Sequence, residues 1–77
     1  MVWEELDNKL VKNFVFKDFK AAFSFLVKVA IEAENANHHP EIFNVYNKVT
    51  LKLCTHDAGS TITEKDRQLA QAIDRLL

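Results

Sequence analysis

Apolar residues at helical spacing after Asp18 place the strongest constraint on the fold. They recur at intervals of three and four up to about Ala36, at Phe19, Ala22, Phe23, Leu26, Val29, Ala30 and Ala33. This spacing gathers them on one face of an α-helix, and Asp18 is suited to cap its first turn. Such a face has to lie on an apolar surface, so the rest of the chain is expected to supply one.

The segments on both sides of this helix favour extended structure. Residues 3–16 carry two short β-prone runs around the turn-forming Asp7-Asn8-Lys9, which indicates a first hairpin. Glu41 to Tyr46 forms a short predicted strand, and Val49 to Thr55 alternates apolar and polar residues as a half-buried strand does. The turn at Tyr46-Asn47-Lys48 makes this pair a second hairpin.

A second helix is predicted at the carboxyl end. Thr63-Glu64-Lys65-Asp66 resembles a capping box, and an apolar stripe follows at Leu69, Ala72, Ile73 and Leu76. The order β-β-α-β-β-α predicts an α+β fold, with a four-stranded antiparallel sheet and helices packed on one face. We expect residues 1–77 to form a single domain.

The size of the chain favours self-association. A chain of 77 residues buries only about 60% of the surface that its unfolded form exposes, so its core is small. A partner surface would add to that core, and we expect a homo-oligomer.

Charge and cysteine content narrow the function classes. A net charge of -1 argues against direct nucleic-acid binding, and no run approaches the roughly 18 apolar residues of a membrane span. The amino terminus lacks the basic and apolar regions of a signal peptide. One cysteine, Cys54, excludes an internal disulfide and suits a reducing compartment. We expect a soluble, cytoplasmic protein with no membrane contact.

The chemistry of the chain is concentrated between Asn37 and Asp57, which holds all three histidines. Histidine has an ordinary pKa of about 6.5, so it both donates and accepts protons near neutral pH. Pro40 favours extended backbone at His39, and adjacent extended residues point to opposite sides. One histidine of the pair His38 and His39 would then face a cleft while the other forms its rim. With His56 after the last strand, the pattern favours general acid/base chemistry.

Two residues outside this span have two interpretations each. Glu34 falls within about 20° of Phe23 on the helical wheel, so the periodicity predicts that it points inward and orients a histidine. The alternative is that it reaches water at a frayed helix end. Trp3 is either a core anchor or the wall of a pocket for a flat ring.

Other site chemistries find less support. Three imidazoles, or two with Glu34 or Asp57, form a conceivable zinc set, but no His-x-x-x-His spacing or paired cysteines support it. No nucleophile motif surrounds Cys54, which is treated as structural. The residues alone leave a surface or structural role open for each histidine.

Three segments taken together resemble the pterin-4a-carbinolamine dehydratase family. They are Glu34-Asn35-Ala36-Asn37-His38-His39-Pro40-Glu41, Phe43 to Val49, and Leu53-Cys54-Thr55-His56-Asp57-Ala58-Gly59. The resemblance implies a dehydratase that converts 4a-hydroxytetrahydropterin, the product left by an aromatic amino acid hydroxylase, to quinonoid dihydropterin. It implies tetrahydropterin recycling, a homodimer or homotetramer, a functional link to such a hydroxylase, and neither a metal nor an organic cofactor.

The resemblance also assigns site residues. It places the three active-site histidines at His38, His39 and His56, with Glu34 as their supporting carboxylate. His38 and His56 are then expected to transfer protons and His39 to contact the substrate.

Trp3 and Asp57 are the further expected substrate contacts. The chain departs from the family pattern at Asn37, at Ile42, where many members have Trp, at Lys65, and in a longer loop at Ser60-Thr61. The alternative function is therefore a non-catalytic oligomeric binding module or transcription cofactor on the same scaffold.

Overall fold

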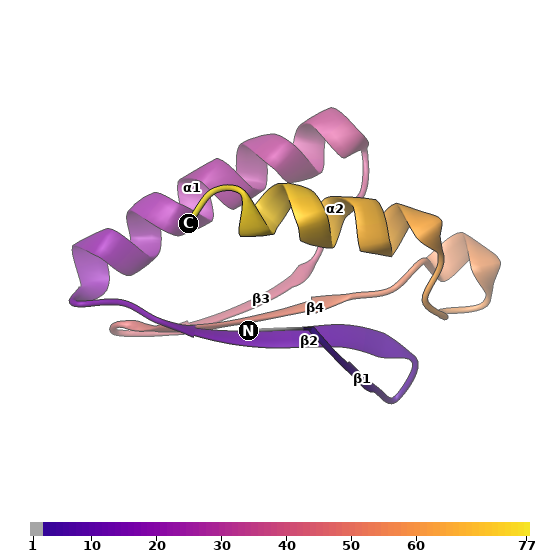
Figure 1. Ribbon diagram of the computed structural model, residues 1–77, viewed down its shortest axis with the longest axis horizontal. Coiled ribbons are helices and arrows are strands. Elements are labelled where there is room, and N and C mark those ends of the chain that lie inside the picture. Colours follow the sequence, from indigo (N-terminus) through magenta and orange to yellow (C-terminus); the bar gives the residue numbers. More distant parts are fainter. Residues whose placement is uncertain (1–2) are drawn as a thin grey trace.

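Four antiparallel strands form one sheet, and two helices cover one of its faces (Figure 1). The computed structural model describes residues 3–77, so the first two residues of the predicted domain lie outside the described part. The strands are β1 (Glu4–Leu6), β2 (Lys9–Val15), β3 (Glu41–Val45) and β4 (Lys48–Leu53), in the spatial order β1-β2-β4-β3. The helices are α1 (Phe19–Ala36) and α2 (Glu64–Asp74), and a short 3-10 helix spans His56–Ala58. The predicted fold class and element order are confirmed.

Residues with left-handed backbone close both hairpins. Asp7 and Asn8 have φ of 51° and 61°, as a two-residue turn with matching twist requires. Tyr46 has φ of 52°, and the Nδ2 group of Asn44 donates to the carbonyl oxygen of Lys48 at 2.9 Å across that turn. The second hairpin differs slightly from the prediction, because β3 ends at Val45 and β4 begins at Lys48.

The core lies between the sheet and both helices, with Leu69, Ala70 and Ile73 contributed by α2. Asp18 caps α1, since its side chain accepts a hydrogen bond from the backbone N–H of Ala21 at 2.8 Å. The buried residues of α1 are Ala22, Phe25, Leu26, Val29 and Ala33. Phe19 and Phe23 are half exposed and Ala30 is also exposed, so the predicted place of these three residues on the buried face is wrong. The apolar arc of α1 is wider than the surface that the sheet covers, and only one side of it is buried.

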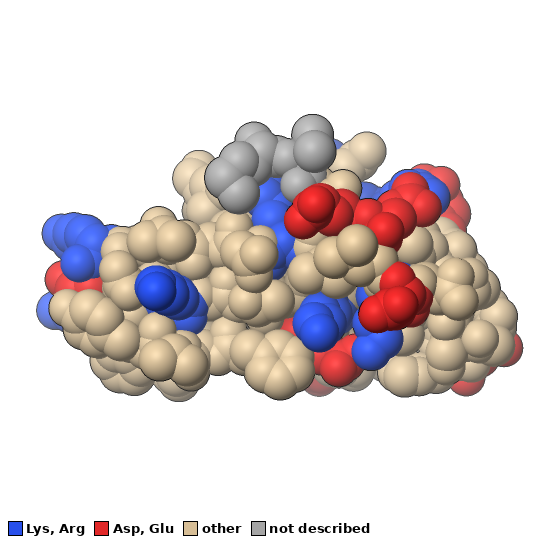
Figure 2. Space-filling view, turned by 90° about the horizontal axis from the view of Figure 1, so that it is seen from below, with Lys and Arg blue, Asp and Glu red and all other residues tan. Residues whose placement is uncertain are grey.

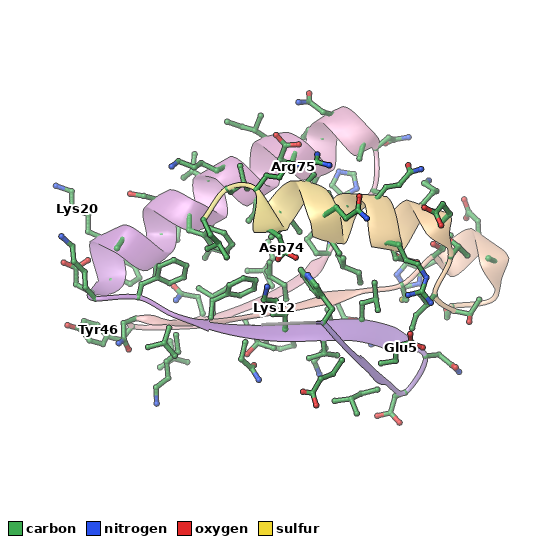
Figure 3. The ribbon with its side chains drawn as sticks, in the orientation of Figure 1. Glu5, Lys12, Lys20, Tyr46, Asp74 and Arg75 are labelled. Atoms are coloured by element: carbon green, nitrogen blue, oxygen red, sulfur yellow. The ribbon has the colours of Figure 1, made fainter. Side chains whose placement is uncertain are left out.

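A polar cluster ties the end of α2 to the sheet. The Nζ of Lys12, on the helix-covered face of β2, lies 2.7 Å from Oδ1 of Asp74, and Figure 3 shows these two side chains approaching each other. The indole Nε1 of Trp3 donates to the same carboxylate at 3.1 Å. Trp3 also packs edge-on against Phe14, with ring centroids 6.1 Å apart. These contacts agree with the interpretation of Trp3 as a core anchor.

The other face of the sheet is not covered by helices. Figure 2 views the molecule from this side and shows basic and acidic side chains interspersed. Lys9 and Glu41 form an ion pair from β2 to β3, with Nζ and Oε2 2.5 Å apart. Within residues 3–77, neither helix is long and apolar enough to cross a membrane.

Candidate active site

The three histidines meet in one cavity where α1 ends, β4 ends and α2 begins. The cavity has a volume of about 160 Å³, and its lining includes His38, His39, Cys54, Thr55, His56 and Asp57. His38 and His56, which are 18 positions apart in the sequence, are thus brought together, because the second hairpin returns the chain to the end of α1. Four of the predicted site residues, the three histidines and Asp57, share this cavity.

The carboxyl end of α1 fixes the direction of His38. Asn37 adopts the left-handed conformation with φ of 50°, and its N–H donates to the carbonyl oxygen of Glu34 at 3.2 Å. The next N–H, that of His38, donates to the carbonyl oxygen of Ala33 at 3.0 Å. This pattern is typical of a helix that ends and reverses direction. It directs His38 into the protein, where the residue is only 8% exposed.

His38 is held by a buried carboxylate that the sequence assigned only to a helix cap. Its Nε2 lies 2.5 Å from Oδ1 of Asp66, and Asp66 is fully buried. The other oxygen of Asp66 accepts hydrogen bonds from Thr55 Oγ1 and from the backbone N–H of Thr63, both at 2.8 Å. Asp66 therefore completes the predicted capping box of α2 and fixes the orientation of the imidazole at the same time.

The second ring nitrogen of His38, Nδ1, is reached by solvent. It has no hydrogen bond to residues 3–77, and no buried side-chain nitrogen or oxygen in that range lacks a partner. The Nδ1 atom is therefore reached by solvent even though most of the ring is buried. A ring with one nitrogen bound to a carboxylate and the other open to solvent can exchange a proton there.

The environment of Asp66 favours its charged form. Burial alone would raise the pKa of this carboxyl, but hydrogen bonds from His38, the Thr63 backbone and Thr55 outweigh it. The net effect holds the pKa of Asp66 below its ordinary value. Asp66 is thus a buried anion that is hydrogen-bonded to His38.

His39 and Glu34 form an exposed pair beside the cavity. The His39 Nε2 lies 2.6 Å from Oε2 of Glu34, which gives Glu34 the predicted contact with a histidine. Of the two orientations left open for Glu34, the structure has the one that reaches water, because the side chain is 76% exposed. Glu34 shares its wheel position with Phe23, and that side of α1 faces away from the sheet.

His56 opens the short 3-10 helix after β4 and is exposed. Its Nδ1 lies 3.4 Å from Oγ of Ser60, and Gly59 closes the turn with φ of 82°. Ser60 belongs to the segment in which the sequence departs from the family pattern. This longer loop therefore contacts a predicted catalytic histidine directly.

The positions of Trp3 and Asp66 differ from what the sequence led us to expect. Trp3 lines a separate cavity between β1 and α2, so the described chain does not bring it to the histidines. Its role as a substrate contact stays a prediction. Asp66 was missed as a site residue, and its only sequence signal was the Thr63–Asp66 capping spacing, which says nothing about a histidine.

No metal-binding group is formed in the described part of the chain. Within residues 3–77, no three His, Cys, Asp or Glu side chains gather closely enough to hold an ion. The Nε2 atom of His38 is instead bound to Asp66, and the Nε2 atom of His39 is bound to Glu34. The arrangement is one of separate imidazole and carboxylate pairs around a cavity.

Comparison with known proteins identifies the family. Residues 1–76 match the family model described as Pterin 4 alpha carbinolamine dehydratase. Relatives named for this dehydratase occur in Prochlorococcus marinus and Solibacter usitatus, at 50% and 51% identity over 74 residues. The match covers 96% of this chain and 76% and 77% of theirs, respectively.

Solved structures agree with this assignment. A transcriptional coactivator/pterin dehydratase from Brucella melitensis is 38% identical with a TM-score of 0.90, covering 96% of this chain and 80% of that one. A pterin dehydratase-like protein, described as a RuBisCO assembly factor in the alpha-carboxysome, is 25% identical with a TM-score of 0.84. That match covers 99% of this chain and 89% of the other. The chain belongs to the pterin-4a-carbinolamine dehydratase family.

Proposed function

We propose that the protein removes water from 4a-hydroxytetrahydropterin to give quinonoid dihydropterin. The observation that carries this proposal is His38, which is anchored to the buried Asp66 through Nε2 and lines the histidine cavity. Membership of the family supplies the substrate class.

The reaction needs one proton donor and one proton acceptor. The bond between carbon 4a and its hydroxyl oxygen breaks, and the oxygen leaves as water after it receives a proton. The lone pair of ring nitrogen 5 forms the new double bond to carbon 4a, and a ring N–H gives its proton to a base. Each positioned acid or base contributes about 10²- to 10⁴-fold.

The two proton-transfer roles fall to His38 and His56. His38, whose ring is held through Nε2 by Asp66, is the proposed acid that protonates the leaving oxygen. The exposed imidazole of His56 is the proposed base for the ring N–H and returns its proton to water. His39, held by Glu34, is the proposed substrate contact at the rim, and Asp57 is a second contact in the same cavity.

A direct assay tests this proposal. Chemically generated 4a-hydroxytetrahydropterin decays spontaneously, and the wild-type protein should accelerate that decay. We expect His38→Ala and His56→Ala each to slow the catalysed reaction by about 10²-fold or more. The exposed Gln71→Ala on α2 is the control and should retain the wild-type rate. Equal decay with and without wild-type protein would refute the dehydratase function.

We also infer that the protein acts as a homodimer or homotetramer through the exposed side of α1. Phe19, Phe23, Val27 and Ile31 form a stripe at intervals of four on this side, and each is about half exposed. Ile42 continues the stripe, since it lines a shallow apolar cavity together with Phe23 and Val27. A contiguous apolar surface of this kind is typical of an interface.

The proposed biological setting is tetrahydropterin recycling. The substrate is the product of an aromatic amino acid hydroxylase, so such an enzyme is the proposed functional partner. The proposed compartment is the cytoplasm, in which a free thiol such as Cys54 persists.

The second candidate function is a non-catalytic binding module. The likeness to a protein described as a RuBisCO assembly factor favours it, because that protein has the same fold at a TM-score of 0.84. This candidate predicts that the protein binds a pterin or a partner protein without accelerating dehydration. Calorimetric binding of a stable tetrahydropterin, measured with the decay assay, separates the two candidates.

A further inference from the structure

Thr55 is a buried residue of the histidine cavity to which the proposed reaction gives no role. It lies between β4 and His56 in the chain and is 7% exposed. Its side chain binds the carboxylate that holds His38, and its backbone adjoins His56. Thr55 is therefore connected to both histidines that are proposed to transfer protons.

We propose that Thr55 is a positioning residue that holds His38 and His56 in a fixed relation to each other. Its hydroxyl orients His38 through Asp66, and its backbone fixes the turn that carries His56. The inference rests on the proposed dehydratase function, and it adds a residue that acts through the two histidines.

The hydroxyl of Thr55 fixes the carboxylate that binds His38. Asp66 uses Oδ1 for His38 Nε2, at 2.5 Å, and Oδ2 for Thr55 Oγ1, at 2.8 Å. A carboxylate anion only accepts hydrogen bonds, so Thr55 is the donor. Its single hydroxyl proton is then in use, and the 2.6 Å contact between Thr55 Oγ1 and Thr63 Oγ1 takes its proton from Thr63. Together these bonds hold the plane of the carboxylate and, with it, the ring of His38.

The backbone of Thr55 closes the loop that carries His56. Its N–H donates to the carbonyl oxygen of Thr61 at 2.8 Å, and its carbonyl oxygen accepts from the N–H of Ala58 at 3.2 Å. The loop therefore leaves from Thr55 and returns to it. Within the described part of the chain, the one hydrogen bond of the His56 side chain is the 3.4 Å contact with Ser60, inside the same loop. The place of the His56 ring consequently depends on how Thr55 is held.

Loss of the Thr55 hydroxyl should disconnect the two histidines. Thr55→Val keeps the shape of the side chain and removes the donor. The carboxylate of Asp66 is then free to turn, and the loop loses the bond that ties it to that carboxylate. A displacement of about 1 Å in a reacting group can cost about 10²-fold in rate.

The first test measures kcat and KM for the decay of 4a-hydroxytetrahydropterin with the full-length protein. Thr55→Val should lower kcat about tenfold or more, with KM little changed. Thr50→Val on β4 is the control, since it removes a hydroxyl that donates to Asn13 at 2.6 Å in an exposed position, and kcat should stay at the wild-type value.

A second pair of variants isolates the hydroxyl if Thr55→Val folds poorly. Thr55→Ser and Thr55→Ala both lose the buried methyl group, but only serine keeps the donor to Asp66. Thr55→Ser should retain most of the wild-type kcat, and Thr55→Ala should lose as much as Thr55→Val.

Thr63→Val separates positioning from stability. It removes the other hydroxyl of the same cluster and should lower the urea midpoint as Thr55→Val does. Its kcat should stay close to the wild-type value, because Thr55 still donates to Asp66.

Nitrogen-15 NMR of the imidazole rings provides a readout that needs no substrate. The signals of His38 and His56, assigned with the two histidine-to-alanine variants, should both shift in Thr55→Val and stay near their wild-type positions in Thr63→Val. The inference is overturned if Thr55→Val leaves kcat or these signals unchanged, or if Thr55→Val and Thr63→Val lower kcat alike. A wild-type protein that does not accelerate the decay refutes the dehydratase function instead, and the NMR comparison then still decides whether Thr55 positions the two rings.

Discussion

His38 and Asp66 are 28 positions apart in the sequence, yet their Nε2 and Oδ1 atoms lie 2.5 Å apart in the interior. Asp66 also caps α2, so one carboxylate stabilises the start of a helix and orients a ring of the candidate active site. Loss of this carboxylate should therefore affect stability and catalysis together.

The change Asp66→Asn should separate those two effects. It removes the charge beside His38 and keeps the shape, so we expect kcat to fall about 10²-fold with KM little changed. The variant should also lose about 1–3 kcal/mol of stability, because a buried charge-assisted hydrogen bond is weakened. Steady-state kinetics at a temperature where the variant is folded, with urea unfolding in parallel, provide both values.

The exposed Glu64→Gln, in the same helical turn, is the matched control for that experiment. It should change neither kcat nor the urea midpoint by more than a small amount. If Asp66→Asn lowers stability but leaves kcat unchanged, Asp66 is a capping residue alone and does not position His38.

The lowered pKa of Asp66 predicts the acid sensitivity of the fold. A carboxyl with a lower pKa in the folded state stabilises the protein above its ordinary value of 3.8, and this contribution is lost as the pH falls through the folded pKa. The contribution of Asp66 to the free energy of unfolding should thus be lost as the pH falls below its ordinary value of 3.8. Urea titrations in this pH region should show a shallower decline for Asp66→Asn. Identical pH slopes for the two proteins would contradict the prediction.

Glu34→Gln should have a small effect confined to substrate binding. The pair with His39 is largely exposed, and exposed ion pairs contribute at most about 1 kcal/mol. We expect KM to rise a few-fold while kcat stays close to the wild-type value. A loss of kcat comparable with that of His38→Ala would instead place Glu34 in proton transfer.

The pair between Lys12 and Asp74 should respond unequally to the loss of either partner. The Lys12 side chain is 5% exposed and that of Asp74 is 39% exposed. Asp74→Ala leaves the buried ammonium group of Lys12 without its partner and should cost about 3 kcal/mol or more. Lys12→Met leaves a carboxylate that can still reach water and accept from Trp3, so it should cost less than half as much. Urea unfolding of both variants measures the difference, and equal losses would contradict this account.

A charge on the exposed side of α1 should break the proposed oligomer. Val27→Lys places an ammonium group within the apolar stripe, and its burial at an interface would be unfavourable. We expect light scattering after gel filtration to show a shift to monomer. Leu6→Lys in β1 is the control, because Leu6 is 50% exposed and Val27 51%. A wild-type monomer, or an oligomer unaffected by Val27→Lys, would exclude this interface.

Local sequence signals were sufficient for most of the fold. Asp18 predicted the start of α1, and the Thr63–Asp66 spacing predicted the start of α2. These signals act within a few residues, so they do not depend on how the chain packs. The burial of Phe19 and Phe23 was predicted wrongly because helical periodicity shows that a face is apolar, but not how much of it the sheet covers.

The site was less predictable because its key contact is long-range. The three histidines and Asp57 were identified from the sequence. The sequence does not show that Asp66 of α2 contacts His38, or that Thr55, which follows β4, donates to the same carboxylate. For the same reason the sequence alone did not separate Trp3 from the histidines. Its indole is directed to Asp74 near the other end of α2.

Because Asp66 both caps α2 and binds His38, the candidate active site forms in a particular order. During synthesis, which runs from the amino terminus, the ring of His38 is made 28 residues before the carboxylate that holds it. Until α2 has folded onto the sheet, the nascent chain has an imidazole without its anion. The ring of His38 therefore gains its carboxylate only when α2 packs, and a chain in which α2 is not packed should bind or process little substrate.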